Sequence, residues 1–233
     1  MTRCIASAVL ACLFLLSLPA IAGEIYSNGP VNGTSDAWTI NFGFIVSNTF
    51  TVSAGNSTIT GVSFGAWVYP GDVLESAEVS MSSDALGGGT VYFDQVVNFT
   101  QSGCSANQYG YNVCVETGAF TGPTLGNGTY WLNLQNAVVN DGDPIYWDEN
   151  DGIGCNSPGC PSMALGNNCI NTPGYQCIGS ESFTLTGNNQ ATVPEPGSMV
   201  LFGSGLLSVV GILRRKRHAA RRSASGYFIR QHS

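Results

Sequence analysis

Apolar and polar side chains alternate along much of this chain, and that alternation constrains the fold more than any other feature. It is clearest in residues 38–46, 77–82 and 111–116, where every second side chain is apolar. A period of two is typical of a β-strand with one buried face. Shorter apolar runs that also predict strands lie at residues 50–52, 59–68, 91–99, 130–134 and 183–185.

Glycine, proline and asparagine separate these runs, as in residues 69–72 and 125–128. Such residues favour turns, and no segment between them shows an amphipathic helical stripe with caps. With 43% hydrophobic residues the chain is too apolar to stay disordered. We therefore predict an all-β domain over residues 23–192, an antiparallel jelly-roll-like β-sandwich of eight or more short strands.

Charge is distributed unevenly along the sequence. Residues 4–213 contain no Lys, Arg or His, and residues 24–181 hold fourteen of the fifteen acids. Such a surface repels phosphate backbones, so we expect no nucleic-acid partner. A Ser-His-Asp or Cys-His pair, a lysine Schiff base and a histidine metal site are excluded as well, and no enzymatic activity is expected. A glycoside-active enzyme needs only two carboxylates, for example Asp148 and Glu181, and stays open as an alternative.

The first 22 residues have the pattern of a secretory signal peptide. Arg3 precedes an apolar run over residues 5–18, and the segment ends in Ala20-Ile21-Ala22. Small residues at the first and third of these positions suit a signal peptidase, so cleavage is expected after Ala22. A retained membrane anchor is the alternative, but the run is short for a bilayer.

The C-terminal part has three features in a fixed order. Pro194-Glu195-Pro196 comes first, then seventeen uncharged residues at 197–213, then Arg214-Arg215-Lys216-Arg217. Seventeen residues cover about 26 Å as a helix, enough for a thin bilayer, and a basic cluster stays on the cytoplasmic side. We expect a transmembrane helix with the acidic domain outside the cell and residues 218–233 as a cytoplasmic tail extension.

Taken together, residues 193–217 resemble the PEP-CTERM sorting domain of surface proteins from Gram-negative bacteria that make extracellular polysaccharide. The resemblance implies recognition by an exosortase, a membrane-embedded cysteine protease, with processing near Pro194-Glu195-Pro196. Members usually end soon after the basic cluster, whereas this chain continues to Ser233. The resemblance thus implies transient anchoring in the inner membrane, followed by a cell-surface or extracellular location.

Segments of the middle region also resemble an ectodomain type found on other PEP-CTERM proteins, for which we know of no assigned activity. The segments are residues 59–67, 128–137, 146–150 and 181–184. We expect a non-enzymatic surface or matrix protein with a structural or adhesive role among extracellular polysaccharide. A calcium-dependent carbohydrate-binding module is the main alternative.

Six cysteines remain after removal of the signal peptide: Cys104, Cys114, Cys155, Cys160, Cys169 and Cys177. An even number in an exported chain predicts disulfides, with fifteen possible connectivities. Cys104 and Cys114 flank a hairpin-like stretch and are the pair we expect to be joined, while the other four lie in one Pro/Gly/Asn-rich loop. A zinc site is the weaker alternative, because a second ligand pair and histidine are both missing.

Two further sites are open from the sequence. Residues 141–151 hold five acids, and Asp141, Asp143, Asp148 and Asp151 are candidate calcium ligands, although the spacing does not match an EF-hand loop. The alternative is that these acids lie in solvent-exposed turns and bind no metal. Trp131 and Trp147 are candidate stacking platforms for a sugar ring, with ordinary packing between the sheets as the alternative.

Overall fold

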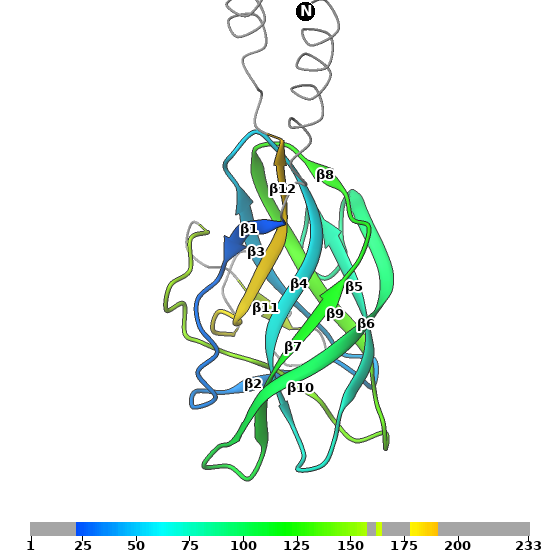
Figure 1. Ribbon diagram of the computed structural model, residues 1–233, viewed down its shortest axis with the longest axis vertical. Coiled ribbons are helices and arrows are strands. Elements are labelled where there is room, and N and C mark those ends of the chain that lie inside the picture. Colours follow the sequence, from blue (N-terminus) through cyan, green and yellow to red (C-terminus); the bar gives the residue numbers. More distant parts are fainter. Residues whose placement is uncertain (1–21, 158–161, 165–177, 191–233) are drawn as a thin grey trace, which may run out of the picture. The chain divides into compact units, whose positions relative to one another are not determined.

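The computed structural model describes residues 22–157, 162–164 and 178–190, and within them every regular element is a strand (Figure 1). The strands are β1 (Gly23–Ser27), β2 (Ala37–Thr39), β3 (Ile45–Val52), β4 (Asn56–Val68), β5 (Leu74–Ser82), β6 (Val91–Ala106), β7 (Asn112–Ala119), β8 (Thr124–Leu125), β9 (Gly128–Val139), β10 (Tyr146–Asp148), β11 (Ser162–Ala164) and β12 (Phe183–Gln190). The prediction of an all-β domain is confirmed.

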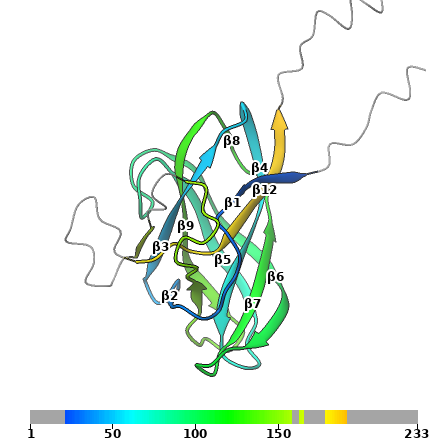
Figure 2. The same cartoon turned by 90° about the vertical axis from the view of Figure 1, so that its left-hand side faces the viewer.

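All strand pairs are antiparallel and form one continuous sheet in the order β1-β12-β4-β7-β6-β5-β9-β3-β11. The long strand β6 connects the two halves of this sheet. Its first part pairs with β5, up to Asn98, and its second part pairs with β7, from Phe99 onward. Figure 2 shows the two halves facing each other. The jelly-roll connectivity stays a prediction.

One hydrophobic core fills the space between the two halves. Phe50 of β3 and Leu134 of β9 come from one half, and Phe64 of β4 and Leu185 of β12 from the other; all four are fully buried. Tyr26 of β1 links the halves, because its ring lies 6.2 Å from that of Phe50. Alternation along each strand supplies these inward side chains.

The predicted strand over residues 38–46 is interrupted. A turn at residues 41–43 separates β2 from β3, and Phe42 in this turn has a φ of 56° and is 64% exposed. A positive φ ends strand geometry, and Gly43, also at positive φ, continues the turn. The sequence alternation passes through this break because Ile40 and Val46 are both buried on either side of it.

The two ends of strand β4 define the two poles of the domain. Its first residue, Asn56, pairs with Gln190, close to where the described chain ends, and Gly23 pairs with Gly187 nearby in the same sheet. Its last residue, Val68, lies at the opposite pole beside Asn112. Thirteen residues at about 3.3 Å each separate the poles by about 40 Å. Figure 1 shows the β4–β5 and β6–β7 turns at the lower pole.

The expected disulfide between Cys104 and Cys114 is present and joins β6 to β7, with Cα atoms 4.1 Å apart. It lies at a bulge in β6, between Ser102 and Ser105. The pairing of Cys155, Cys160, Cys169 and Cys177 stays a prediction, since the last three lie outside the described residues. The same holds for the signal peptide and for residues 193–233. No helix in the described part is long and apolar enough to span a membrane.

Candidate functional site

Aromatic side chains gather at the lower pole, which we call the tyrosine pole and define by Trp67, Tyr69, Tyr109, Tyr111 and Tyr146. Trp67 and Tyr109 stack with ring centroids 5.5 Å apart, and Tyr69 lies 4.9 Å from Tyr111. Tyr111 in turn meets Tyr146 edge-on at 5.5 Å. The turns that carry these residues are held together by ring contacts, and Tyr109 remains 55% exposed.

A small pocket of about 150 Å³ opens within the tyrosine pole and is walled by Trp67, Tyr111, Tyr146, Ala37 and Asp36. Burial is the main cause that raises the pKa of Tyr146 above its ordinary value. The hydroxyl of Tyr111 donates to that of Tyr69 at 3.5 Å, and this contact is the main reason why the pKa of Tyr69 is raised. The pocket offers aromatic faces, hydroxyls and one carboxylate.

Three carboxylates form an acidic cluster beside the tyrosines. Asp72 from the β4–β5 turn meets Asp141 and Asp143 from the turn after β9, with one oxygen of each within 4.8 Å of the others. Asp72 is only 5% exposed, and burial is the first cause that raises its pKa to about 6, with Asp141 and Asp143 adding to the rise. The other two are exposed. Repulsion in this cluster is not balanced by any lysine, arginine or histidine of the domain.

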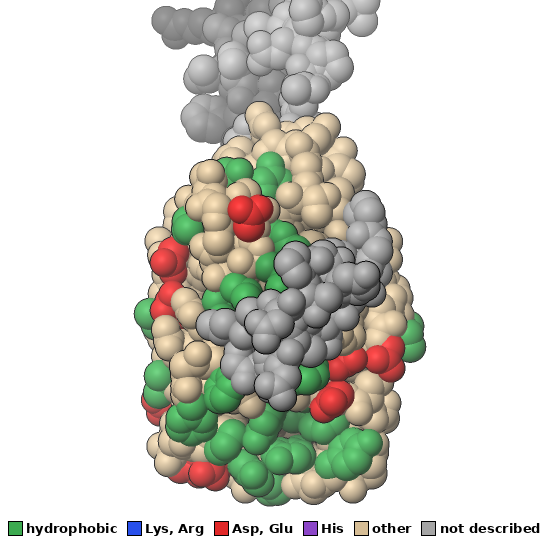
Figure 3. Space-filling view, turned by 180° about the vertical axis from the view of Figure 1, so that it is seen from behind, with side chains coloured by type: hydrophobic (Ala, Val, Ile, Leu, Met, Phe, Trp, Pro, Cys, Tyr) green, Lys and Arg blue, Asp and Glu red, His purple; other side chains and the backbone are tan. Residues whose placement is uncertain are grey.

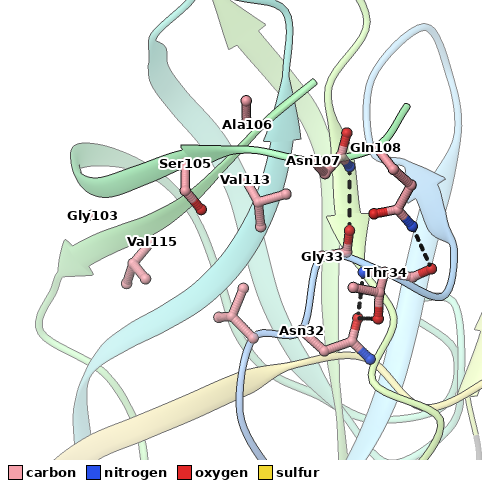
Figure 4. Close-up of a pocket in the computed structure, with 11 residues that line it drawn as sticks. Asn32, Gly33, Thr34, Gly103, Ser105, Ala106, Asn107, Gln108, Val113 and Val115 are labelled. Carbon is pink, nitrogen blue, oxygen red and sulfur yellow. Dashed lines mark hydrogen bonds between the residues drawn. The ribbon is translucent and has the colours of Figure 1, made fainter. Parts of the chain in front are cut away.

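A larger pocket of about 340 Å³ lies between residues 31–34 and the β6–β7 hairpin, with Val113 and Val115 among its lining residues (Figure 4). Asn107 donates through Nδ2 to the Gly33 carbonyl at 3.3 Å, and Gln108 donates through Nε2 to the Thr34 carbonyl at 3.2 Å. None of the lining residues carries a charge. The pocket can bind through amides and apolar contacts, and its own residues supply no acid or base.

The carboxylate of Asp148 is fully buried and acts as a structural anchor. Its oxygens accept hydrogen bonds from the backbone N–H groups of Asn32 and Gly33, both at 2.9 Å. They also accept from Trp67 Nε1 at 2.6 Å and from the Ser182 hydroxyl at 3.1 Å. Four donors in a buried position satisfy the charge without a cation. Asp148 thereby ties residues 32–33 to β4 and to Ser182, just before β12.

Two buried glutamates, Glu149 and Glu181, face each other in an isolated antiparallel β-bridge. The bridge joins the residue after β10 to the segment before β12. Burial raises the pKa of Glu181 well above its ordinary value, and Glu149 and Asp148 raise it further. The Ser162 hydroxyl acts in the opposite direction, but it donates to the Ser47 carbonyl at 3.1 Å. Burial is also the main cause that raises the pKa of Glu149, although Trp38 Nε1 donates to that carboxylate at 2.9 Å. Glu181 is thus a fully buried core residue, and its surroundings favour the protonated carboxyl group.

The four expected calcium ligands do not come together. Asp141 and Asp143 join Asp72 instead, while Asp148 is saturated by its four donors and Asp151 accepts from Ser35 Oγ at 2.8 Å. Sequence reasoning missed Asp72 because it precedes Asp141 by 69 positions. The only sequence signal at Asp72 is the turn-forming stretch at residues 69–72. A turn signal does not say which distant acids Asp72 meets. The alternative pair of Asp148 and Glu181 is fully buried, so it does not face solvent.

The two expected stacking tryptophans differ in their surroundings. Trp147 is fully buried, contacts Phe64 and Phe183, and donates through Nε1 to the Ser182 carbonyl at 2.8 Å. The expectation of an exposed platform at Trp147 is therefore corrected, because both faces of β10 are covered. Trp131 is half-buried on the outer face of β9, and its role in sugar binding stays a prediction.

Figure 3 shows hydrophobic side chains gathered at the lower end of the domain, with acidic side chains at its margins and no lysine or arginine in view. The described residues hold no Lys, Arg or His at all. The surface potential of this domain is negative throughout. A neutral or cationic ligand is favoured there, and an anionic one is repelled.

Comparison with known proteins identifies the C-terminal segment. Residues 192–217 match the PEP-CTERM protein-sorting motif, one residue longer than the segment expected from its three features. No curated protein matches the chain. The motif implies exosortase processing, export and a membrane-anchored sorting step.

Proposed function

We propose that this chain is an exported, non-enzymatic surface or matrix protein whose β domain has a structural or adhesive role in extracellular polysaccharide. The PEP-CTERM match at residues 192–217 carries the proposal. An exosortase processes the chain near Pro194-Glu195-Pro196, after a signal peptidase has removed residues 1–22. The domain then stays at the cell surface or outside the cell.

The processing step is tested by replacing Pro194, Glu195 and Pro196 with alanine in the producing bacterium. The variant should accumulate as a full-length species in the inner membrane fraction, because the protease loses its recognition motif. A matched triple replacement of Asn188, Asn189 and Gln190, just before the motif, should leave processing unchanged. Release of the first variant at the rate of the natural chain would refute the processing step.

A second candidate, the carbohydrate-binding module, is favoured by the tyrosine pole. Tyr69 and Tyr109 are 37% and 55% exposed. They contact Tyr111 and Trp67, two residues that line a pocket together with Asp36. Sugar rings bind on aromatic faces, while hydroxyl groups bond to carboxylates and amides. A neutral polysaccharide is the ligand class that this negative surface accepts.

Glycan-array binding of the full chain, with and without calcium, tests this candidate. Tyr109→Ala and Tyr69→Ala should each weaken binding by about tenfold, the effect of losing one stacking contact. Tyr92→Ala is the matched control, because Tyr92 is 42% exposed but contacts Tyr130 instead of the tyrosine pole. An equal loss of glycan affinity in all three variants would show that the tyrosine pole is not the binding site.

A further inference from the structure

Two turns at the tyrosine pole are joined by reciprocal hydrogen bonds. The Val73 N–H donates to Asn140 Oδ1 at 2.8 Å, and the Asn140 N–H donates to the Val73 carbonyl at 3.2 Å. Leu74 pairs with Val139 directly behind them. The β4–β5 turn and the turn after β9 therefore hold a fixed spacing, and the three acids of the cluster are carried on these two turns.

Further donors hold the loops that carry the same acids. The Asp143 N–H donates to Asp141 Oδ1 at 3.2 Å, Asn41 Nδ2 donates to the Asp143 carbonyl at 2.9 Å, and Gln101 Nε2 donates to the Asp72 carbonyl at 3.2 Å. These contacts position the loop backbone.

The decisive observation concerns Asp72 itself. Its side chain is 95% buried, since only 5% is exposed, and its Oδ2 has no hydrogen-bond partner. A buried, unpartnered carboxylate oxygen costs several kcal/mol unless a proton or a cation neutralises it. This oxygen belongs to a side chain that lies within 4.8 Å of two further carboxylates, and residues 4–213 supply no cationic side chain.

We propose that Asp72, Asp141 and Asp143 bind a calcium ion at the tyrosine pole. The donors are all oxygens, which excludes the nitrogen and sulfur ligands that zinc prefers. One oxygen of each acid lies within 4.8 Å of the others, so a single ion can bind all three. Calcium accepts flexible oxygen sites, whereas magnesium demands near-ideal octahedral geometry and gives up its water reluctantly. Water completes the coordination, since Asp141 and Asp143 are exposed.

Calcium links the β4–β5 turn to the turn after β9 and thereby fixes the tyrosines beside them. This site stands independently of the sorting step and of saccharide binding. Affinities of extracellular calcium modules lie at about 0.1–1 mM. The site is therefore occupied where calcium is millimolar, outside the cell, which is where the sorting motif directs the domain.

Calorimetric titration of the full chain, purified in detergent and freed of metal with a chelator, tests the proposal with calcium chloride as the probe. One ion should bind with a dissociation constant of about 0.1–1 mM, and 10 mM calcium should raise the unfolding temperature by about 5 °C. Magnesium should bind at least tenfold more weakly.

Variants assign the binding to these residues. Asp141→Asn and Asp72→Asn should each weaken calcium binding at least tenfold, and Asp141 is exposed, so its variant keeps the test valid should Asp72→Asn fail to fold. Asp84→Asn removes an exposed acid from the turn after β5 and should bind within twofold of the natural chain. The proposal is overturned by any of three results: no saturable binding up to 10 mM, an equal loss in Asp84→Asn, or unchanged binding in Asp141→Asn.

Discussion

Glu116 of β7 is an acid without a partner in the interior of the domain. Its side chain is fully buried, it lies on the inward face with Cys114, and neither carboxyl oxygen has a hydrogen-bond partner. Burial raises its pKa from 4.5 to about 7. We predict that replacing Glu116 with Gln stabilises the domain at neutral and alkaline pH.

The magnitude follows from the two pKa values. A difference of about 2.5 units at about 1.36 kcal/mol each corresponds to about 3 kcal/mol. Below pH 4.5 both the folded and the unfolded state carry the proton, and the carboxyl group costs nothing. Between pH 4.5 and about 7 only the unfolded state releases the proton, so stability falls as pH rises, and above 7 the full cost applies.

Thermal unfolding of the full chain in detergent, recorded from pH 4 to pH 9, measures this effect. Glu116→Gln should unfold about 5–10 °C above the natural chain at pH 8 and at nearly the same temperature at pH 4.5. Glu116→Met, which lacks polar side-chain atoms, should show the same pH dependence. A difference between variant and natural chain that is equal at both pH values would refute the reasoning, because packing alone does not titrate.

Three further predictions concern the framework. Replacing Cys104 and Cys114 together with serine should lower the free energy of unfolding by about 3 kcal/mol in a urea titration, and an unchanged midpoint would contradict this. Asp148→Asn replaces one accepting oxygen with an NH2 group that faces other donors, and it should cost about 2–4 kcal/mol with faster hydrogen exchange at the Gly33 amide. Unchanged exchange at that amide would contradict the role of Asp148 as an anchor. Trp147→Ala should cost about 3–5 kcal/mol through a core cavity, and a loss below 1 kcal/mol would contradict its burial.

The sequence predicts those parts of the fold in which apolar and polar side chains alternate along a strand. Alternation over residues 77–82 anticipated β5, whose bounds are Leu74–Ser82, and the hairpin spacing anticipated the disulfide of Cys104 and Cys114. In both cases the information is local, because a period of two or a short loop is visible within ten residues.

The candidate sites depend on pairing between distant segments and were predicted only in part. Asp72 reaches Asp141 through the register in which Leu74 faces Val139, and local sequence does not encode that register. Trp147 illustrates a second limit. Both faces of β10 are covered, so alternation cannot distinguish an inward indole from an exposed one.

Strands β4 and β12 run in opposite directions along eight paired positions, from Phe64 opposite Phe183 to Asn56 opposite Gln190. A tether attached after Gln190 and a load applied beyond Val68 would pull these strands apart lengthwise. The backbone hydrogen bonds between the two strands lie perpendicular to that direction. They would therefore be loaded all at once and would not break one after another. The domain is thus expected to resist tension applied along β4 and β12.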